Sequence, residues 1–258
     1  MNEENKYESI IDVKNLSRIF RKHHESSEDV FSKIKSFLIK KGGYDELRVL
    51  DGISFELRKG EMLGILGRNG SGKTTLLKII GKILKPTSGD VKINGNVSSL
   101  LSLGSGFHPD LSVKQNVILY GIILGKSKEE MEEKLPEVIK FAELEDFADS
   151  KFKDFSTGMK MRLALSTALC VDPDVLLVDE IIAVGDYAFQ KKSTDEFLKI
   201  KNSGKSIVFV SHNLDQVKQF CDRVILLEKG KIMKIGNPDE VIKEYISLMD
   251  KKWTSHKK

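Results

Sequence analysis

The sequence predicts an α/β fold in which a largely parallel β-sheet forms the core and a helical subdomain is inserted into it. Three features support this class. Apolar, strand-like segments open the chain, residues 113–169 carry apolar side chains at helical spacing, and strands alternate with helices from residue 175 onward. That last alternation is typical of βαβ units and therefore of a parallel sheet. With 258 residues, the chain is long enough for one large domain with an inserted subdomain.

The first part of the chain predicts strands and one helix. Residues 10–20 are expected to form a strand followed by a turn, and residues 21–46 then interrupt the pattern with a polar, lysine-rich insertion. Further elements are expected as strands at 49–57 and 61–66, a helix at 74–84 and extended, turn-rich chain at 91–103.

The second part predicts helices first and then a return to strands. Helices are expected at 114–124, 128–144 and 157–170. Strands are expected at 175–178, 206–210, 224–228 and 231–234, with helices filling the spaces between them.

Charge and hydropathy narrow the class of function. The 42 Lys and Arg exceed the 38 Asp and Glu by a net charge of only +4, which predicts no nucleic-acid partner but permits contact with an anionic membrane face. No run approaches the ~18 apolar residues of a spanning helix, and the polar residues 1–9 do not resemble a signal peptide. We therefore expect a soluble protein whose membrane role is indirect. Cys170 and Cys221 are expected to be buried thiols in a reducing cytosol.

A glycine-rich segment predicts a phosphate-binding loop. It fits the pattern G-x-x-x-x-G-K-[ST] between an apolar strand and an amphipathic helix, and consists of Gly67, Arg68, Asn69, Gly70, Ser71, Gly72, Lys73 and Thr74. Its glycines let backbone N–H groups turn toward phosphate oxygens, and the following helix offers its positive end to the same anion. Lys73 can reach the β- and γ-phosphates, and the Thr74 hydroxyl suits Mg²⁺. This loop, with Thr75 after it, is expected to bind nucleotide.

Two carboxylates follow a strand of apolar residues. Residues 175–178 lead directly to Asp179 and Glu180. Asp179 can hold the Mg²⁺ shell, and Glu180 can polarise a water for attack on the γ-phosphate. An acidic pair after a strand is usually a solvated loop, but its place after a phosphate loop favours a catalytic role.

A phosphate loop alone would leave kinases, GTPases and helicases open, but further segments resemble the ABC (ATP-binding cassette) ATPase family. Residues 155–159, Phe-Ser-Thr-Gly-Met, are similar to its signature motif and open a helix. Ser156 is a good N-cap, and Gly158 lets a phosphate approach the helix N-terminus. The resemblance implies that Ser156 and Gly158 bind ATP in trans, in the site of a second, facing subunit. Standing alone, the segment would be an ordinary capped helix.

Three more positions match that family. Residues 183–186 occupy the place of the D-loop, which implies that Asp186 lies at the dimer interface. His212 matches the switch histidine that contacts the γ-phosphate, and Phe20 lies where the family stacks an aromatic ring on adenine. The resemblance thus implies catalytic roles for Glu180 and His212 in a site for ATP and Mg²⁺. Outside this context, such a histidine is more often structural, and Phe20 is open to a core role.

The resemblance covers residues 10–245 and implies a P-loop NTPase (RecA-like) core with an antiparallel β-subdomain and an inserted α-helical subdomain. A single ABC domain is expected. Its parts are the first half of the nucleotide-binding core at 1–104 with the insertion at 21–46, the helical subdomain with the signature motif at 105–170, the second half of the core at 171–245 and a tail at 246–258.

Within that family, the sequence resembles the ATPase subunits of exporters for O-antigen, teichoic acid and related cell-surface polysaccharides. The similar stretches are 103–111, 155–163 and 179–190, together with Met159 in the signature and an insertion between the first two strands. The resemblance implies a homodimer, a separate integral-membrane permease and a peripheral place on the cytoplasmic face of the cell membrane. Importer or drug-exporter ATPases, and soluble ABC ATPases that act on nucleic acid or ribosomes, are the alternatives. The soluble class usually has paired cassettes or a long coiled coil, which this sequence lacks.

Three segments bear on coupling and substrate. The glutamine of the family's Q-loop is missing, with Leu103 at about its position, so no residue is assigned to that role. Between residues 29 and 41, apolar side chains at helical spacing beside lysines predict a helix that either contacts the permease or membrane or packs on its own domain. Residues 246–258 are too few to fold alone and predict a helix end with an extension, so we expect the permease, rather than this chain, to contact the polymer.

Overall fold

The computed structural model describes residues 8–23, 44–101, 106–179 and 185–255. Its core is a six-stranded sheet in the order β5-β6-β7-β3-β8-β9. The strands are β3 (Met62–Leu66), β5 (Val97–Ser99), β6 (Val175–Asp179), β7 (Ser206–Val210), β8 (Arg223–Glu228) and β9 (Lys231–Gly236). All neighbours pair in parallel except β8 and β9, which are antiparallel. The predicted α/β class with a parallel core is confirmed.

The central strands are apolar on both faces because both faces are covered. One face packs against strands β1 (Ser9–His23) and β2 (Tyr44–Arg58) and helix α2 (Lys73–Ile80). The residues on this face are Leu63, Ile65, Val175, Leu177, Val208 and Val210. The other face packs under the C-terminal helices through Met62, Leu66, Leu176, Val178, Ile207 and Phe209. The alternation along each strand therefore sends successive side chains into two separate cores.

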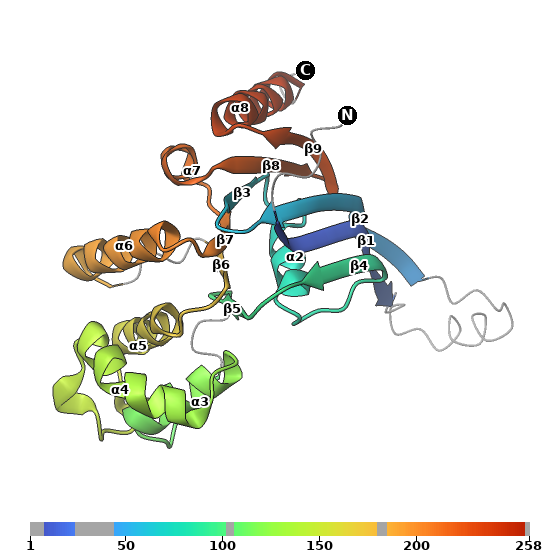
Figure 1. Ribbon diagram of the computed structural model, residues 1–258. Coiled ribbons are helices and arrows are strands. Elements are labelled where there is room, and N and C mark those ends of the chain that lie inside the picture. Colours follow the sequence, from blue (N-terminus) through green and yellow to red (C-terminus); the bar gives the residue numbers. More distant parts are fainter. Residues whose placement is uncertain (1–7, 24–43, 102–105, 180–184, 256–258) are drawn as a thin grey trace, which may run out of the picture.

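A three-stranded antiparallel sheet, in the order β2-β1-β4, lies beside the core sheet (Figure 1). Its strands are β1 (Ser9–His23), β2 (Tyr44–Arg58) and β4 (Ser88–Ile93). The expected turn after Phe20 and the insertion bounds 21–46 are wrong, because β1 and β2 stay paired from Phe20–Leu47 out to His23–Tyr44. Backbone hydrogen bonds between the two strands hold these polar ends extended. Residues 24–43, and with them the predicted helix of the insertion, lie outside the described residues.

The first described helix, α2 (Lys73–Ile80), is shorter than the predicted 74–84. Gly81 is its C-cap, and Lys82 takes a left-handed conformation with φ 57°. The amides of Ile83 and Leu84 both donate to the Lys78 carbonyl, at 2.9 and 3.0 Å, so the chain turns back over the last helical turn.

Three helices form a subdomain on the opposite side of the core sheet from the antiparallel strands (Figure 1). They are α3 (Val113–Ile123), α4 (Lys128–Ala142) and α5 (Thr157–Cys170), with two short 3₁₀ turns at Glu145–Phe147 and Phe152–Asp154. Ser112 and Ser127 cap α3 and α4 with complete capping boxes. The helical subdomain has a core of its own, built around Val117, Met131 and Leu163.

The remaining helices are α6 (Tyr187–Asn202), α7 (Leu214–Phe220) and α8 (Pro238–Ser255). The helix end predicted after residue 245 is therefore part of α8, which continues to Ser255. Cys170 and Cys221 are buried as expected, and burial raises the pKa of each thiol to about 12. Among the described residues, no helix combines the length and apolar character that crossing a membrane requires.

Candidate nucleotide-binding site

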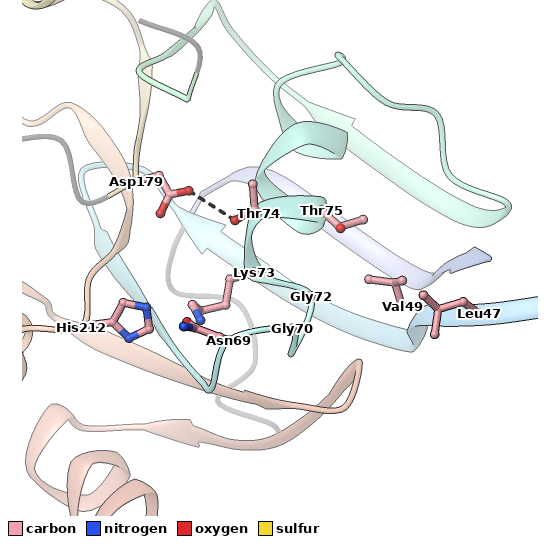
Figure 2. A pocket seen from close by; sticks show the side chains of 10 residues that line it. All are labelled: Leu47, Val49, Asn69, Gly70, Gly72, Lys73, Thr74, Thr75, Asp179 and His212. Carbon is pink, nitrogen blue, oxygen red and sulfur yellow. Dashed lines mark hydrogen bonds between the residues drawn. The ribbon is translucent and has the colours of Figure 1, made fainter. Parts of the chain in front are cut away.

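A pocket of about 460 Å³ lies at the carboxyl edge of the core sheet (Figure 2). Four separate segments contribute to it: the start of β2, the loop before α2, the end of β6 and the segment after β7. The described residues that line it are Leu47, Val49, Asn69, Gly70, Gly72, Lys73, Thr74, Thr75, Asp179 and His212.

The parallel sheet brings these segments together. Strands β3, β7 and β6 are neighbours, with Ile65 and Asp179 both paired to Val210. Chain that leaves parallel strands emerges at the same edge, which is where α/β folds bind ligands. Residues far apart in the sequence thus come to one place because three short strands share a register.

The phosphate-binding loop depends on glycine where it enters α2. Gly72 has φ 109°, a region that L side chains rarely adopt. A Cβ at this position would lie 2.7 Å from Leu50 Cδ2 and 2.8 Å from the Val49 carbonyl oxygen. The loop therefore lies directly against β2, and no larger residue fits at this point. Gly67, Arg68 and Ser71 belong to the same loop without lining the pocket.

The Lys73 side chain is held inside this loop. Its ammonium donates to the carbonyl oxygens of Gly67 at 2.7 Å and Arg68 at 3.0 Å, and the residue is only 7% exposed. Holding the amine in this way places a positive charge at the centre of the loop. Such a fixed charge suits the binding of phosphate oxygens.

Thr74 and Asp179 form a pair suited to a magnesium ion. The Thr74 hydroxyl donates to Asp179 Oδ2 at 3.4 Å, although the residues come from α2 and β6 (Figure 2). A hydroxyl and a carboxylate are hard oxygen donors, and Mg²⁺ in nucleotide sites takes few protein ligands beside phosphates and water. The donor set therefore fits Mg²⁺.

His212 lies at the pocket because of the turn that begins α7. Asn213 caps this helix, with its Oδ1 accepting from the amides of Asp215 at 3.0 Å and Gln216 at 3.1 Å. Ser211 Oγ accepts from the Asn213 amide at 3.1 Å. These bonds fix the backbone on either side of His212, whose imidazole borders the space beside Lys73 and Asn69.

The base end of the pocket differs from the sequence-based expectation. Phe20 does not line the pocket, whereas Leu47, its cross-strand partner, does, together with Val49. The Arg18 guanidinium covers the Phe20 ring, with 4.5 Å from Cζ to the ring centroid. Sequence reasoning missed Leu47 because it assigned residues 21–46 to an insertion and began β2 only at residue 49. Leu47 could have been found by extending the β1–β2 pairing outward to Phe20, because Leu47 lies opposite Phe20 in that ladder.

Other predicted residues lie at helix starts outside this pocket. Ser156 caps α5, its Oγ accepting from the Met159 amide at 3.2 Å, which confirms the predicted N-cap. Asp186 caps α6, accepting from the Phe189 amide at 2.9 Å. A Cβ at Gly158 would meet no atom closer than Ser156 Oγ at 3.9 Å, so the start of α5 is open. Glu180, Leu103 and residues 183–184, the first half of the predicted D-loop, lie outside the described residues.

Comparison with known proteins agrees with this geometry. A family model described as "ABC transporter" matches residues 50–183, just over half of the chain. This chain belongs to the ABC transporter family.

Curated relatives have more specific names. An O-antigen export system ATP-binding protein of Klebsiella pneumoniae is 35% identical over 246 residues, which are 94% of this chain and 99% of that protein. A protein with the same description from Myxococcus xanthus is 48% identical over 199 residues. The alignment covers 77% of this chain but only 46% of that longer relative. A solved ATP-binding cassette, in a dimeric post-hydrolysis state bound to ADP and Pi, has a TM-score of 0.68 and 26% identity, covering 88% of this chain and 98% of that one.

Proposed function

We propose that this chain is the ATP-hydrolysing subunit of an exporter for a cell-surface polysaccharide or teichoic acid. The observation that carries the ATPase part is the convergence of the phosphate loop, the Thr74–Asp179 pair and His212 on one pocket. The names of relatives that align over nearly the whole chain support the export part, because they describe O-antigen export and teichoic acids export.

The chain binds the nucleotide mainly through charge. Backbone amides of residues 67–75 and the positive end of α2 bind the phosphates, and the Lys73 ammonium neutralises oxygens of the β- and γ-phosphates. Thr74 and Asp179 would hold Mg²⁺, which when bound neutralises charge on the same phosphates. Leu47 and Val49 supply an apolar surface for the base and ribose, and Phe20 pairs with Leu47 on the neighbouring strand.

Hydrolysis in this proposal is an in-line displacement. A water oxygen bonds to the γ-phosphorus while the bond from that phosphorus to the β–γ bridging oxygen breaks, giving ADP and phosphate. The Glu180 carboxylate orients the water and accepts its proton. His212 donates a hydrogen bond to a γ-phosphate oxygen. Each side chain therefore acts on the attacking water or on the charge that develops around it.

Two copies of the chain would close around two nucleotides. The open start of α5, with Ser156 and Gly158, would meet the γ-phosphate held by the phosphate loop of the facing copy, and Asp186 would lie at the contact between copies. An N-terminal helix end suits this role because its amides and dipole favour an anion. The dimeric state of the similar ATP-binding cassette bound to ADP and Pi supports this arrangement.

The remaining partner is an integral-membrane permease, which would hold this chain at the cytoplasmic face of the membrane and contact the polymer itself. The test has two parts, one with the purified chain and one with the cells that produce it. The purified protein should release phosphate from ATP when Mg²⁺ is present, and EDTA should stop this release. In the cell, removing the gene should abolish a surface polysaccharide or teichoic acid. Complementation by wild type, but not by Lys73→Ala, would support both parts. Hydrolysis with unchanged surface polymers would assign the ATPase to another transporter.

Recognition of the polymer can be tested separately. Calorimetry with the purified chain should detect no binding to the exported polysaccharide, because the permease selects it. Saturable, sugar-specific binding to the isolated subunit would overturn this part of the proposal.

A further inference from the structure

A cluster of charged side chains joins three helices outside the nucleotide pocket. Glu143 follows α4, Arg162 lies on α5 and Lys192 lies on α6. Arg162 Nη2 donates to Glu143 Oε2, and Lys192 Nζ donates to Glu143 Oε1 at 3.2 Å. One carboxylate thus links two helices of the helical subdomain to a helix that covers the core sheet. We call these three residues the Glu143 clamp.

Aromatic rings hold the two cations of the clamp in place. Lys192 Nζ also donates to the Phe141 carbonyl oxygen at 2.8 Å and lies 4.7 Å from the centroid of the Phe141 ring. Arg162 Cζ lies 4.5 Å from the centroid of Phe189, and the Phe141 and Phe189 rings meet edge to face at 6.0 Å. The Arg162 side chain is only 19% exposed. The Arg162 cation, which lies over a ring face in a largely buried place, therefore has little freedom to move, whereas the Lys192 and Glu143 side chains are 36% and 52% exposed.

Glu143 has an uncommon backbone conformation. Glu143 ends α4 in the left-handed conformation, with φ 58° and ψ 49°. Glycine, and sometimes asparagine, is favoured at such a position, because other L residues adopt it at a cost in free energy. A glutamate here is unfavourable for the helix end itself. Its carboxylate nevertheless contacts both α5 and α6.

The clamp connects the two helices whose starts carry predicted dimer-facing residues. Arg162 follows the Ser156 cap of α5 by six positions (156 to 162), and Lys192 follows the Asp186 cap of α6 by six positions (186 to 192). At 1.5 Å per residue, each cation lies about 9 Å along its helix from the capped end. The clamp therefore joins α5 and α6 close to both of these starts and restrains how far the starts can move apart.

We propose that Glu143 is a positioning residue for ATP hydrolysis. Through Arg162 and Lys192 it holds the starts of α5 and α6 in one arrangement, so that Ser156 and Asp186 reach the facing copy together. This inference rests on the proposed function, because it assumes that ATP closes two copies of the chain.

The decisive variant is Glu143→Asn, because asparagine tolerates the left-handed conformation but carries no charge and reaches less far. We expect kcat to fall about three- to tenfold, the size of effect that loss of coupling between elements produces. Binding of a fluorescent ATP analogue to the single subunit, and the Tm, should stay at wild-type values. Glu143→Asp, which keeps the charge, should recover part of the rate. The matched control is Glu132→Gln, which removes a carboxylate from α4, where Glu132 pairs with Lys128 of the same helix at 3.4 Å.

A second measurement follows the dimer directly. In a Glu180→Gln background, ATP should drive dimer formation in sedimentation velocity, and adding Glu143→Asn should lower the dimer fraction. Lys192→Gln, which removes the link between Glu143 and α6, should also lower the dimer fraction. This variant tests the inference if Glu143→Asn does not fold. Rates and dimer fractions for Glu143→Asn and Lys192→Gln that match Glu132→Gln would overturn the inference. A wild-type chain without turnover would instead overturn the proposed function, and this inference with it.

Discussion

The phosphate end and the base end of the nucleotide pocket are built in different ways. The phosphate end comes mainly from one continuous segment, 67–75, whose lysine is 7% exposed and held by two backbone carbonyls at 2.7 and 3.0 Å. The base end comes from β2, where Leu47 is 63% exposed and Val49 lies further along the strand. One end is a fixed polar loop, and the other is an open apolar surface.

The difference follows from what each end has to bind. Phosphate charge is stabilised by donors whose positions are set before binding, so the loop tolerates little change. An apolar base surface acts through the area it removes from water, which has no preferred direction, so different side chains on a strand can supply it. We therefore expect substitutions to have large effects at the phosphate end and small ones at the base end.

The largest effect is expected for the catalytic step at the phosphate end. Glu180→Gln should lower kcat by about a hundredfold or more, because an amide cannot accept the proton of the attacking water. Binding of ATP should be retained, and the ATP-bound dimer should accumulate. The measurement is steady-state phosphate release beside nucleotide binding. Residual activity above about a tenth of wild type would show that another group positions the water.

A slightly smaller effect is expected where the loop touches β2. Gly72→Ala should weaken ATP binding by about tenfold and destabilise the fold by about 1–3 kcal/mol, since φ is 109° and a Cβ would lie 2.8 Å from the Val49 carbonyl. Calorimetric titration and thermal unfolding measure the two quantities. Gly70→Ala is the matched control, because a Cβ there meets nothing within 4 Å and only its φ of 78° opposes the change. Equal losses in both variants would refute the role assigned to this contact.

The proposed magnesium ligands can be tested with an almost isosteric change. Thr74→Val removes the hydroxyl that lies 3.4 Å from Asp179 and should raise the Mg²⁺ concentration needed for half-maximal turnover by about tenfold. Nucleotide binding in EDTA should change little, because the side-chain volume is kept. Thr74→Ser retains the hydroxyl and should stay close to wild type. An unchanged Mg²⁺ requirement in the valine variant would remove Thr74 from the metal site.

The smallest effect is expected at the base end. Leu47→Ala should weaken ATP binding by only a few-fold, because it removes part of an apolar contact of about 25 cal/mol per Å². Its Tm should not change, since the side chain is 63% exposed. Phe20→Ala, measured beside it, decides which of the two residues contacts the base. A loss of affinity at Leu47 as large as that at Gly72 would contradict the contrast between the two ends.

Local signals were enough for much of the fold. The predicted bounds of 157–170 agree with α5, because Ser156 provides a cap and the apolar residues that follow have helical spacing. The predicted strand 206–210 agrees with β7, whose residues are all buried. The outer part of the β1–β2 ladder was missed because residues 21–23 and 45–46 are charged or polar and show no hydrophobic alternation. In that part, backbone pairing rather than a hydrophobic pattern sets the conformation.

By itself, the sequence determined the parallel core, the inserted helices and the phosphate loop, since each is encoded in a contiguous run of residues with its own periodicity or glycine pattern. Only the tertiary structure decided that Leu47 lines the pocket whereas Phe20 does not, and that Glu143 joins Arg162 to Lys192. These contacts are between residues on different elements. Whether such side chains meet depends on strand register and on the packing of helices, which are set by the whole core rather than by the residues in contact.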